Sequence, residues 1–220
     1  EEVLSYYKPP ENIVNPSTLL YELFGVKLLR TFEKNLSPIL NKYIGYSAKY
    51  KSLSISLMDE KEVIKTIAIR KAFSRDGKTI KWKTYGSKKF MPIKIKEDFI
   101  FIGVGMAEFI ILEAMSVSYI LIQSDSMYTH ITRDVISRTQ GKNIIILKEN
   151  DKSFEKLILK LHEIFINSNV FVIDFGKILN KDVSKGYDFR DFCNEIGDIG
   201  EVKKLLEKEL LKIIRGNPHA

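Results

Sequence analysis

The sequence is organised around residues 99–108, which read FIFIGVGMAE. The four large apolar residues 99–102 precede a glycine and indicate a strand that is buried on both faces, as in a parallel sheet. Residues 109–115 contain helix formers and no breaker, so we expect strand, glycine turn and helix to follow one another directly. In such units, ligands usually collect at the carboxyl end of the strand, beside the amino-terminal end of the helix.

Length and composition limit the possible classes of protein. The chain has 220 residues, 45% of them hydrophobic, which is enough to build a hydrophobic core in one large domain or two small ones. No apolar stretch approaches the ~20 residues that span a bilayer, and no signal peptide opens the chain, so we expect a cytoplasmic protein. The single cysteine, Cys193, excludes an internal disulfide and a cysteine-rich zinc site. The start at Glu1, not at a methionine, is compatible with a fragment of a longer protein.

The net charge of +7 is concentrated in one segment. Residues 61–96 contain twelve lysines or arginines and two acidic residues, a sum of +10, so the other 184 residues sum to −3. A basic segment on a nearly neutral body is typical of a surface that contacts a phosphate backbone. The alternative is that the lysines only solubilise the exposed faces of strands.

Alternating apolar residues predict an antiparallel β-meander in and before this basic segment. We expect strands over 52–57, 63–70 and 79–85, the first of them half-buried, with turns between them. In the last strand, Trp82 faces one side, whereas Lys81, Lys83 and Tyr85 face the other. Trp82 belongs either to the core, which we favour, or to a platform on which bases stack, and the same choice is open for Tyr85. Upstream of the meander, the pattern predicts helices at 16–24 and 27–43.

Strands and helices alternate in the second half of the chain. Buried strands are expected over 119–122, 143–147 and 170–173. Helices are expected over 127–138, from a cap at Ser153 to Phe165, and at the carboxyl terminus as far as Gly216, with a polar loop around 185–191. Alternation at this spacing indicates a parallel, doubly wound sheet.

The order of residues resembles the TOPRIM domain, the catalytic module that bacterial-type primases, topoisomerases and some nucleases share. In that family the first strand ends in a Glu-Gly-x-x-Asp-like sequence and a later strand ends in Asp-x-Asp, and primases add a Lys-Asp-x-x-Asp-like stretch. The matching segments here are 104–108, 149–151 and 185–191. Segments 75–78 and 86–89 resemble the region that precedes TOPRIM in primase-helicases of phages and plasmids. The resemblance covers roughly residues 50–196.

The resemblance implies a fold, an activity and partners. The expected fold is α/β, a TOPRIM-like parallel sheet with flanking helices, preceded by a small α+β subdomain with an antiparallel meander. The expected parts are an N-terminal subdomain at 1–96, a TOPRIM-like domain at 97–198 and a C-terminal helix at 199–220. The implied activity is synthesis of RNA primers in DNA replication with Mg²⁺ or Mn²⁺. Its partners would be single-stranded DNA, nucleotides and a helicase or a helicase domain outside this chain.

The resemblance also assigns site residues. Glu149 and Asp151 would be metal ligands, since carboxylates from neighbouring strand ends can hold divalent ions against phosphate oxygens. The alternative is an acidic loop that caps the next helix. Asp188 and Asp191 either add a metal ligand or cap a turn. Nucleic-acid binding is assigned to Arg70, Lys78, Lys81, Lys83, Lys88, Lys89 and Lys185.

One position departs from the family pattern. Val104 stands where the family places its general acid/base glutamate, and a valine side chain can neither bind a metal nor transfer a proton. Glu108 occupies the second carboxylate position and is the candidate catalytic residue, the alternative being a solvated acid at the start of a helix. Catalysis is therefore in question, and two other functions stay open. They are a catalytically inactive TOPRIM module that binds or docks on nucleic acid, and a TOPRIM nuclease.

Overall fold

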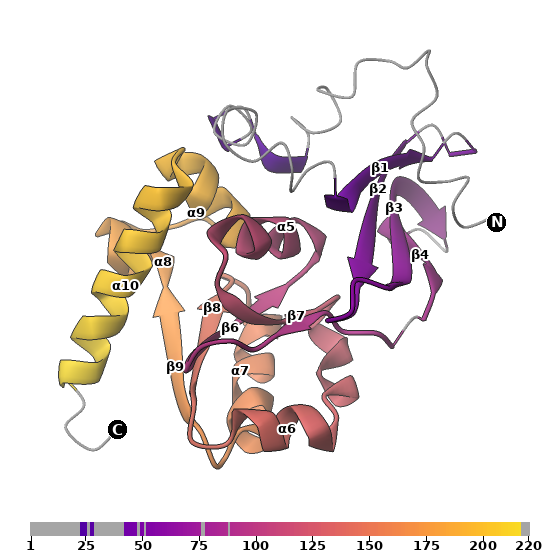
Figure 1. The fold of residues 1–220 in the computed structure, drawn as a ribbon. Helices are drawn as coiled ribbons and strands as arrows, with labels where there is room; N and C mark the ends of the chain where they lie inside the picture. The colour runs from indigo at the N-terminus through magenta and orange to yellow at the C-terminus, as the bar shows by residue number, and fades with distance from the viewer. Residues whose placement is uncertain are drawn as a thin grey trace.

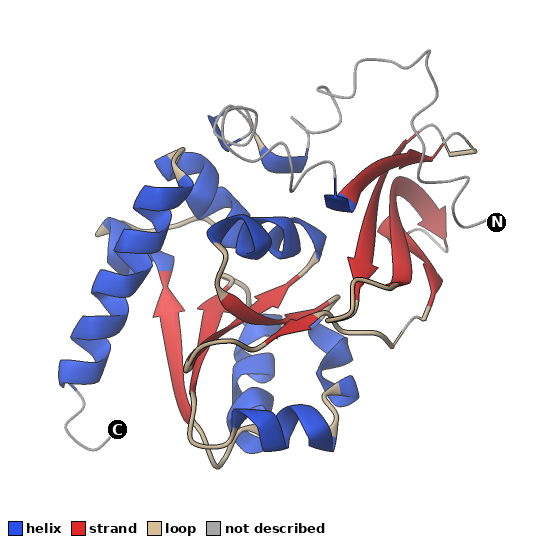
Figure 2. Ribbon diagram, in the orientation of Figure 1, coloured by secondary structure: helices blue, strands red, loops and turns tan. Residues whose placement is uncertain are grey.

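Figures 1 and 2 show a computed structural model of the chain, in which an antiparallel sheet lies beside a second sheet that is flanked by helices. The structure describes residues 23–25, 27–28, 42–47, 49–50, 52–75, 78–87 and 89–216. The helices predicted at 16–24 and 27–43 fall mostly outside the described residues and stay predictions.

The first sheet has the strand order β1-β2-β3-β4, and each strand is antiparallel to its neighbour. Its strands are β1 (Ile44–Ser47), β2 (Ser52–Met58), β3 (Ile64–Arg75) and β4 (Lys78–Gly86). The predicted meander is therefore confirmed, whereas the sequence pattern does not predict β1. β2 is buried on both faces and not half-buried as expected, because Ser54 and Ser56 are as fully buried as the apolar residues that flank them.

The second sheet has the order β5-β7-β6-β8-β9, with the decisive strand β6 at its centre. Its strands are β5 (Ile93–Lys94), β6 (Phe99–Val104), β7 (Ser118–Ile122), β8 (Asn143–Lys148) and β9 (Asn169–Asp174). All pairings among β6, β7, β8 and β9 are parallel, as predicted. The sheet is nevertheless mixed, because the unpredicted two-residue strand β5 runs antiparallel at the edge beside β7.

Alternate residues of each parallel strand contribute to two separate hydrophobic cores. In β6, Ile100 and Ile102 pack on one face of the sheet and Phe101 packs on the other. The first face is covered by α6 (Arg133–Thr139) and α7 (Lys152–Ile164), and the second by α5 (Met106–Met115), α9 (Phe189–Ile196) and α10 (Ile199–Gly216). Burial on both faces explains why these strands are continuous apolar runs.

One predicted helix and one predicted loop differ in part from the structure. The helix expected over 127–138 is divided into the 3₁₀ helix η1 (Asp125–His130) and α6, because Thr132 leaves the helical conformation and its hydroxyl accepts the Val135 amide. The polar loop expected around 185–191 is confirmed for residues 185–188, whereas 189–191 form the start of α9, and the unpredicted short helix α8 (Phe175–Leu179) directly follows β9. In the part of the chain that the structure describes, no helix is long and apolar enough to cross a membrane.

Candidate active site at the carboxyl ends of the parallel strands

A cavity of about 380 Å³ lies where β6, β7 and β8 end. One part of its lining comes from the β6–α5 turn, the residues after β8 and the start of α9. The other part comes from the antiparallel sheet, which contributes Arg70 and Trp82. The cavity therefore joins the two sheets at the edge where the βα units predict a ligand site.

The β6–α5 turn requires glycine at position 105. Gly105 has a φ of 119°, a left-handed conformation that side chains disfavour, and its amide donates to the Ile122 carbonyl over 2.9 Å. A Cβ at this position would lie 2.6 Å from Oε2 of Glu108. The absence of a side chain therefore lets the carboxyl group of Glu108 occupy the space beside the turn. Val104, the last residue of β6, lines the cavity as well.

Glu108 is buried, so the solvated helix-start acid that the sequence left open is wrong. Its exposed fraction is 8%. Burial, together with the negative charges of Asp188 and Glu149, raises the pKa of its carboxyl group to about 8, and Arg190 acts in the opposite direction. A carboxyl group with this pKa keeps its proton at neutral pH and is suited to exchanging it with a bound molecule.

The two acids that follow β8, Glu149 and Asp151, both line the cavity. Asp151 is also the N-cap of α7, because its Oδ1 accepts the Ser153 amide over 2.7 Å. The cap predicted at Ser153 therefore lies two residues after the observed one. This hydrogen bond and the charge of Lys185 lower the pKa of the Asp151 carboxyl group. A carboxylate accepts several hydrogen bonds or ligands at once, so capping does not prevent Asp151 from binding a metal ion.

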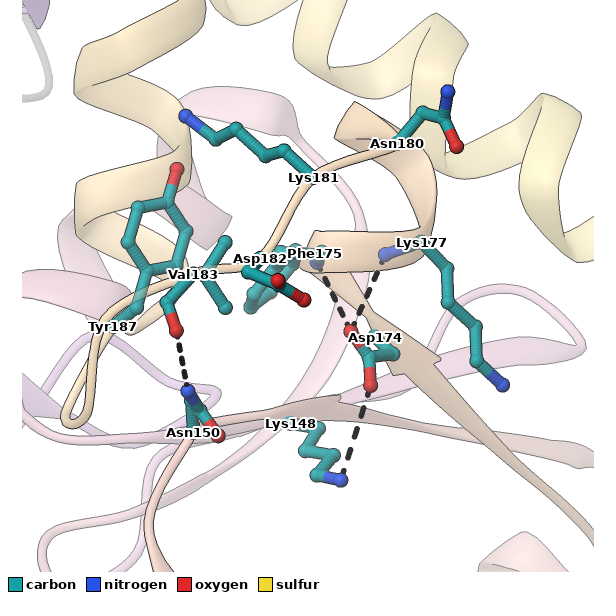
Figure 3. Close-up of a pocket in the computed structure, with 11 residues that line it drawn as sticks. Lys148, Asn150, Asp174, Phe175, Lys177, Asn180, Lys181, Asp182, Val183 and Tyr187 are labelled. Carbon is teal, nitrogen blue, oxygen red and sulfur yellow. Dashed lines mark hydrogen bonds and ion pairs between the residues drawn. The ribbon is translucent and has the colours of Figure 1, made fainter.

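Asn150, between these two acids, holds the loop that leads to α9. Its Nδ2 donates to the Val183 carbonyl over 2.8 Å (Figure 3) and to the Ser184 carbonyl over 3.0 Å. Its backbone amide donates to the Tyr187 carbonyl over 2.9 Å, and its carbonyl accepts the Gly186 amide over 2.8 Å. These four bonds fix the segment directly before Asp188 to the end of β8. The sequence analysis does not identify this role, because an asparagine in an acidic loop carries no signal of its partners.

The two aspartates of the 185–191 segment have different positions. Asp188 is the N-cap of α9 and forms a capping box with Asp191, whose amide donates to Asp188 Oδ1 over 2.8 Å. Asp188 lines the cavity, and burial raises the pKa of its carboxyl group. Asp191 does not belong to the lining, so capping is the role that its position favours.

Arg190 is a site residue that the sequence analysis does not identify. It lines the cavity, and its Nη2 lies 3.2 Å from Oδ2 of Asp188 and 3.4 Å from Oδ1 of Asp191. Its side chain is 30% exposed. The sequence offers one signal for Arg190, its position between two aspartates in the segment DFRD. This signal suggests a local ion pair, but it does not show that the side chain reaches the cavity.

Arg70 and Trp82 are cross-strand partners on β3 and β4. The guanidinium carbon of Arg70 lies 5.9 Å from the centre of the Trp82 ring, within the range of a cation–π contact. Trp82 is half-buried: it packs against the core and also lines the cavity. The two alternatives for Trp82, core residue or accessible ring, are therefore not exclusive.

The other predicted nucleic-acid contacts are spread over the antiparallel sheet and one loop. Nζ of Lys83 lies 3.0 Å from the Tyr50 hydroxyl and 5.1 Å from the ring centres of both Tyr50 and Tyr85. Lys89 is exposed beyond β4, and Lys185 is exposed in the loop that Asn150 holds. Lys78 and Lys81 lie on β4, but their side chains are outside the described part of the structure, as is all of Lys88.

The donor atoms of the cavity fit a hard divalent cation. The carboxyl groups of Glu108, Glu149, Asp151 and Asp188 provide only oxygen ligands, which Mg²⁺ and Mn²⁺ prefer. Among the described residues, no three acidic, histidine or cysteine side chains are grouped tightly enough to hold a metal ion by themselves. Water or substrate oxygens would therefore complete the coordination, as is usual for Mg²⁺.

A second cavity, of about 590 Å³, has Asn150 in its lining (Figure 3). It is lined by Asp174 at the end of β9 and by Lys148, Lys177 and Lys181. Nζ of Lys148 lies 2.7 Å from Glu155 and 3.8 Å from Asp174, and Nζ of Lys181 lies 2.6 Å from Glu195. Two of its three lysines are thus paired with acids.

Comparison with known proteins identifies the fold. No protein-family model and no curated protein matches the sequence. The primase fragment of the bacteriophage T7 primase-helicase protein superposes with a TM-score of 0.50 at 15% identity, over 80% of this chain and 68% of that one. The Aquifex aeolicus primase (zinc binding and RNA polymerase domains) gives a TM-score of 0.49 at 18% identity, over 96% of this chain and 54% of that one. This chain thus spans about half of the Aquifex structure, and the T7 comparison confirms the predicted primase-like fold.

Proposed function

We propose that the chain is the catalytic part of a primase-like enzyme of DNA replication, of phage or plasmid type. It would synthesise RNA primers from nucleotides on single-stranded DNA, with Mg²⁺ or Mn²⁺. The observation that carries the proposal is the composition of one cavity, in which carboxyl groups from β8 and α9 meet an arginine and a tryptophan from the antiparallel sheet. The likeness in fold to the T7 primase fragment supports it.

Each part of the cavity has a role in this proposal. Glu149, Asp151 and Asp188 would hold the ion, which would neutralise phosphate charge during nucleotide transfer. Glu108 is the proton carrier, because its buried carboxyl group is protonated at neutral pH. Arg70 binds phosphate oxygens with its planar fork of donors, and the accessible part of the Trp82 ring stacks on a base.

The DNA template would follow the antiparallel sheet toward the cavity. Lys83, Tyr50 and Tyr85 present a positive charge beside two aromatic rings, the combination that binds single strands without strong sequence preference. Lys89 and Lys185 extend the positive charge on either side. A helicase, fused to the chain or separate, would supply the unwound template, and the enzyme would act in the cytoplasm.

A second function is favoured by Val104. Without a carboxylate at this position the cavity has one metal ligand and one proton carrier fewer than the family pattern. The chain would then be a catalytically inactive module that retains the fold in order to bind or dock on nucleic acid. A nuclease of the same fold would lack the same group.

Primer synthesis on single-stranded DNA distinguishes these functions. The wild-type chain should incorporate labelled ribonucleotides when Mg²⁺ or Mn²⁺ is present. Asp151→Asn should abolish incorporation while leaving α7 intact, because asparagine is an equally good N-cap. Glu207→Gln, an exposed change on α10, is the matched control. Binding of single-stranded DNA without any incorporation by the wild type would favour the inactive module.

A further inference from the structure

Arg190 is in an unusual place for a cation. It is the second residue of α9, in the first turn of the helix, where the helix dipole disfavours positive charge. Its guanidinium group is retained there by the acids around it, with Nη2 at 3.2 Å from Asp188 and 3.4 Å from Asp191. The ion pairs with these two aspartates therefore outweigh the unfavourable interaction of Arg190 with the helix dipole.

The same guanidinium group acts on an acid from another element, Glu108 of α5. Arg190 and Glu108 line one cavity, and each is among the electrostatic partners of the other. Glu108 is 8% exposed, and apart from its own amide no described residue forms a hydrogen bond with its carboxyl group. A buried carboxyl group that faces a cavity without a partner side chain indicates that the cavity receives a ligand.

The formal charges of the cavity favour one divalent ion over two. Its lining contains the four carboxyl groups of Glu108, Glu149, Asp151 and Asp188 and the two guanidinium groups of Arg70 and Arg190. With Glu108 protonated at neutral pH the formal sum is −1, because valine and not an acid stands at position 104. One divalent cation brings this charge to +1, whereas a second would raise it to +3.

We propose that Arg190 takes the place of one metal ion, so that the cavity binds one divalent cation and not two. The cation is held by Glu149 and Asp151 at the end of β8 and by Asp188, whose carboxylate also pairs with Arg190. The guanidinium group then serves as a permanent second positive charge, whose planar fork binds the phosphate oxygens of a nucleotide. The inference rests on the proposed function for the class of ligand, but the number of ions can be measured without any catalysis.

Binding of Mn²⁺ to the full chain, followed by electron paramagnetic resonance of the free ion, tests the proposal. The wild type should bind one Mn²⁺. Arg190→Gln removes the charge and should either admit a second ion or bind the first at least about fivefold more tightly. Arg190→Lys keeps the charge and should behave as the wild type. Lys177→Gln removes an exposed charge at the second cavity and is the control.

Several results would overturn the proposal. A wild-type chain that binds two Mn²⁺ ions, or none, would contradict it without the need for any variant. Equal numbers and affinities in wild type and Arg190→Gln would show that Arg190 only stabilises α9, a role that a thermal melt reports separately. If Arg190→Gln does not fold, the wild-type and Arg190→Lys counts still decide. A one-ion cavity without primer synthesis in any variant would disprove the proposed function and leave this inference standing.

Discussion

Val104 and Glu108 lie on either side of the β6–α5 turn and differ in whether they can transfer a proton. Val104 ends β6 at the cavity and has no group that can exchange a proton. Glu108 follows on the first turn of α5, is buried and has a pKa of about 8. In the proposed function, catalysis would therefore depend on a carboxyl group one helical turn away from the position that the resemblance favours.

Val104→Glu should restore what the valine lacks. The new carboxylate should tighten Mg²⁺ binding and raise primer synthesis, since general acid–base catalysis is typically worth about 10²- to 10⁴-fold. It should destabilise the metal-free protein by about 1–3 kcal/mol, the cost of burying a polar group. Calorimetric titration and an incorporation assay measure the first two effects. Unchanged affinity and unchanged activity would show that residue 104 does not face the bound ion.

Glu108 should make the metal-free protein less stable at high pH. Its folded-state pKa of about 8 lies above the ordinary glutamate pKa of 4.5, so the folded state binds the proton more tightly than the unfolded state does. The free energy of unfolding should therefore be highest below pH ~4.5 and fall as the pH rises toward ~8, by several kcal/mol in order of magnitude. Urea unfolding in EDTA should show this decrease in the wild type and a smaller one in Glu108→Gln. Identical pH profiles would contradict the burial of a titrating carboxyl group at this position.

Long apolar runs and short capped helices differ in how well the sequence predicts them. β6 to β9 are predicted because burial on both faces makes them continuous apolar segments. β1, β5 and α8 have two to five residues each, too few for a periodic pattern. The sequence does not predict the start of α9, because its capping box is polar and has the composition of a loop.

The residues of the candidate site likewise differ in how well the sequence predicts them. Glu149, Asp151 and Asp188 are predicted because they follow strands or stand in a motif. Arg190 and Asn150 are not, because their roles depend on contacts that only the folded chain creates. The pairing of Arg70 with Trp82 on neighbouring strands follows from the register of β3 and β4, which the sequence leaves undetermined.

The loop before α9 provides a test at the scale of one element. Asn150→Ala removes the two side-chain hydrogen bonds to Val183 and Ser184, each worth about 1 kcal/mol, and leaves the backbone bonds in place. Amides of 183–188 should exchange with deuterium faster, and Mg²⁺ should bind several-fold more weakly because Asp188 loses its fixed position. Asn167→Ala, an exposed change outside the site, is the control. Unaltered exchange at 183–188 would mean that the side chain of Asn150 does not hold the loop.

In the whole molecule, the antiparallel sheet and α10 lie at opposite ends (Figure 1). The cavity is lined by residues of the antiparallel sheet and by residues at the carboxyl ends of the parallel strands. The segment 61–96, with its charge of +10, forms most of that sheet and continues to β5. A single strand bound there would reach the cavity past Arg70 and Trp82. The distribution of charge and the position of the cavity thus support one path for the template.

Binding of single-stranded DNA should weaken with salt because contacts to phosphates release counterions. For about four contacts, the slope of log K against log salt should be roughly −3. Replacement of Lys83, Lys89 and Lys185 together by serine should flatten the slope by about 2. The matched control replaces Lys203, Lys204 and Lys208 of α10 and should leave it unchanged. If only the control replacement changes the slope, the DNA-binding surface lies at α10 and not at the antiparallel sheet.

The most direct test of the account is whether a divalent ion binds in the cavity between the two sheets. Fe²⁺ in place of Mg²⁺ generates hydroxyl radicals that cut the backbone near the bound ion, and mass spectrometry identifies the cuts. We expect cuts in 104–108, 149–152 and 187–190, suppressed by excess Mg²⁺ and by Asp151→Asn. Cuts confined to 174–182, around the second cavity, or none above the metal-free background would contradict the account.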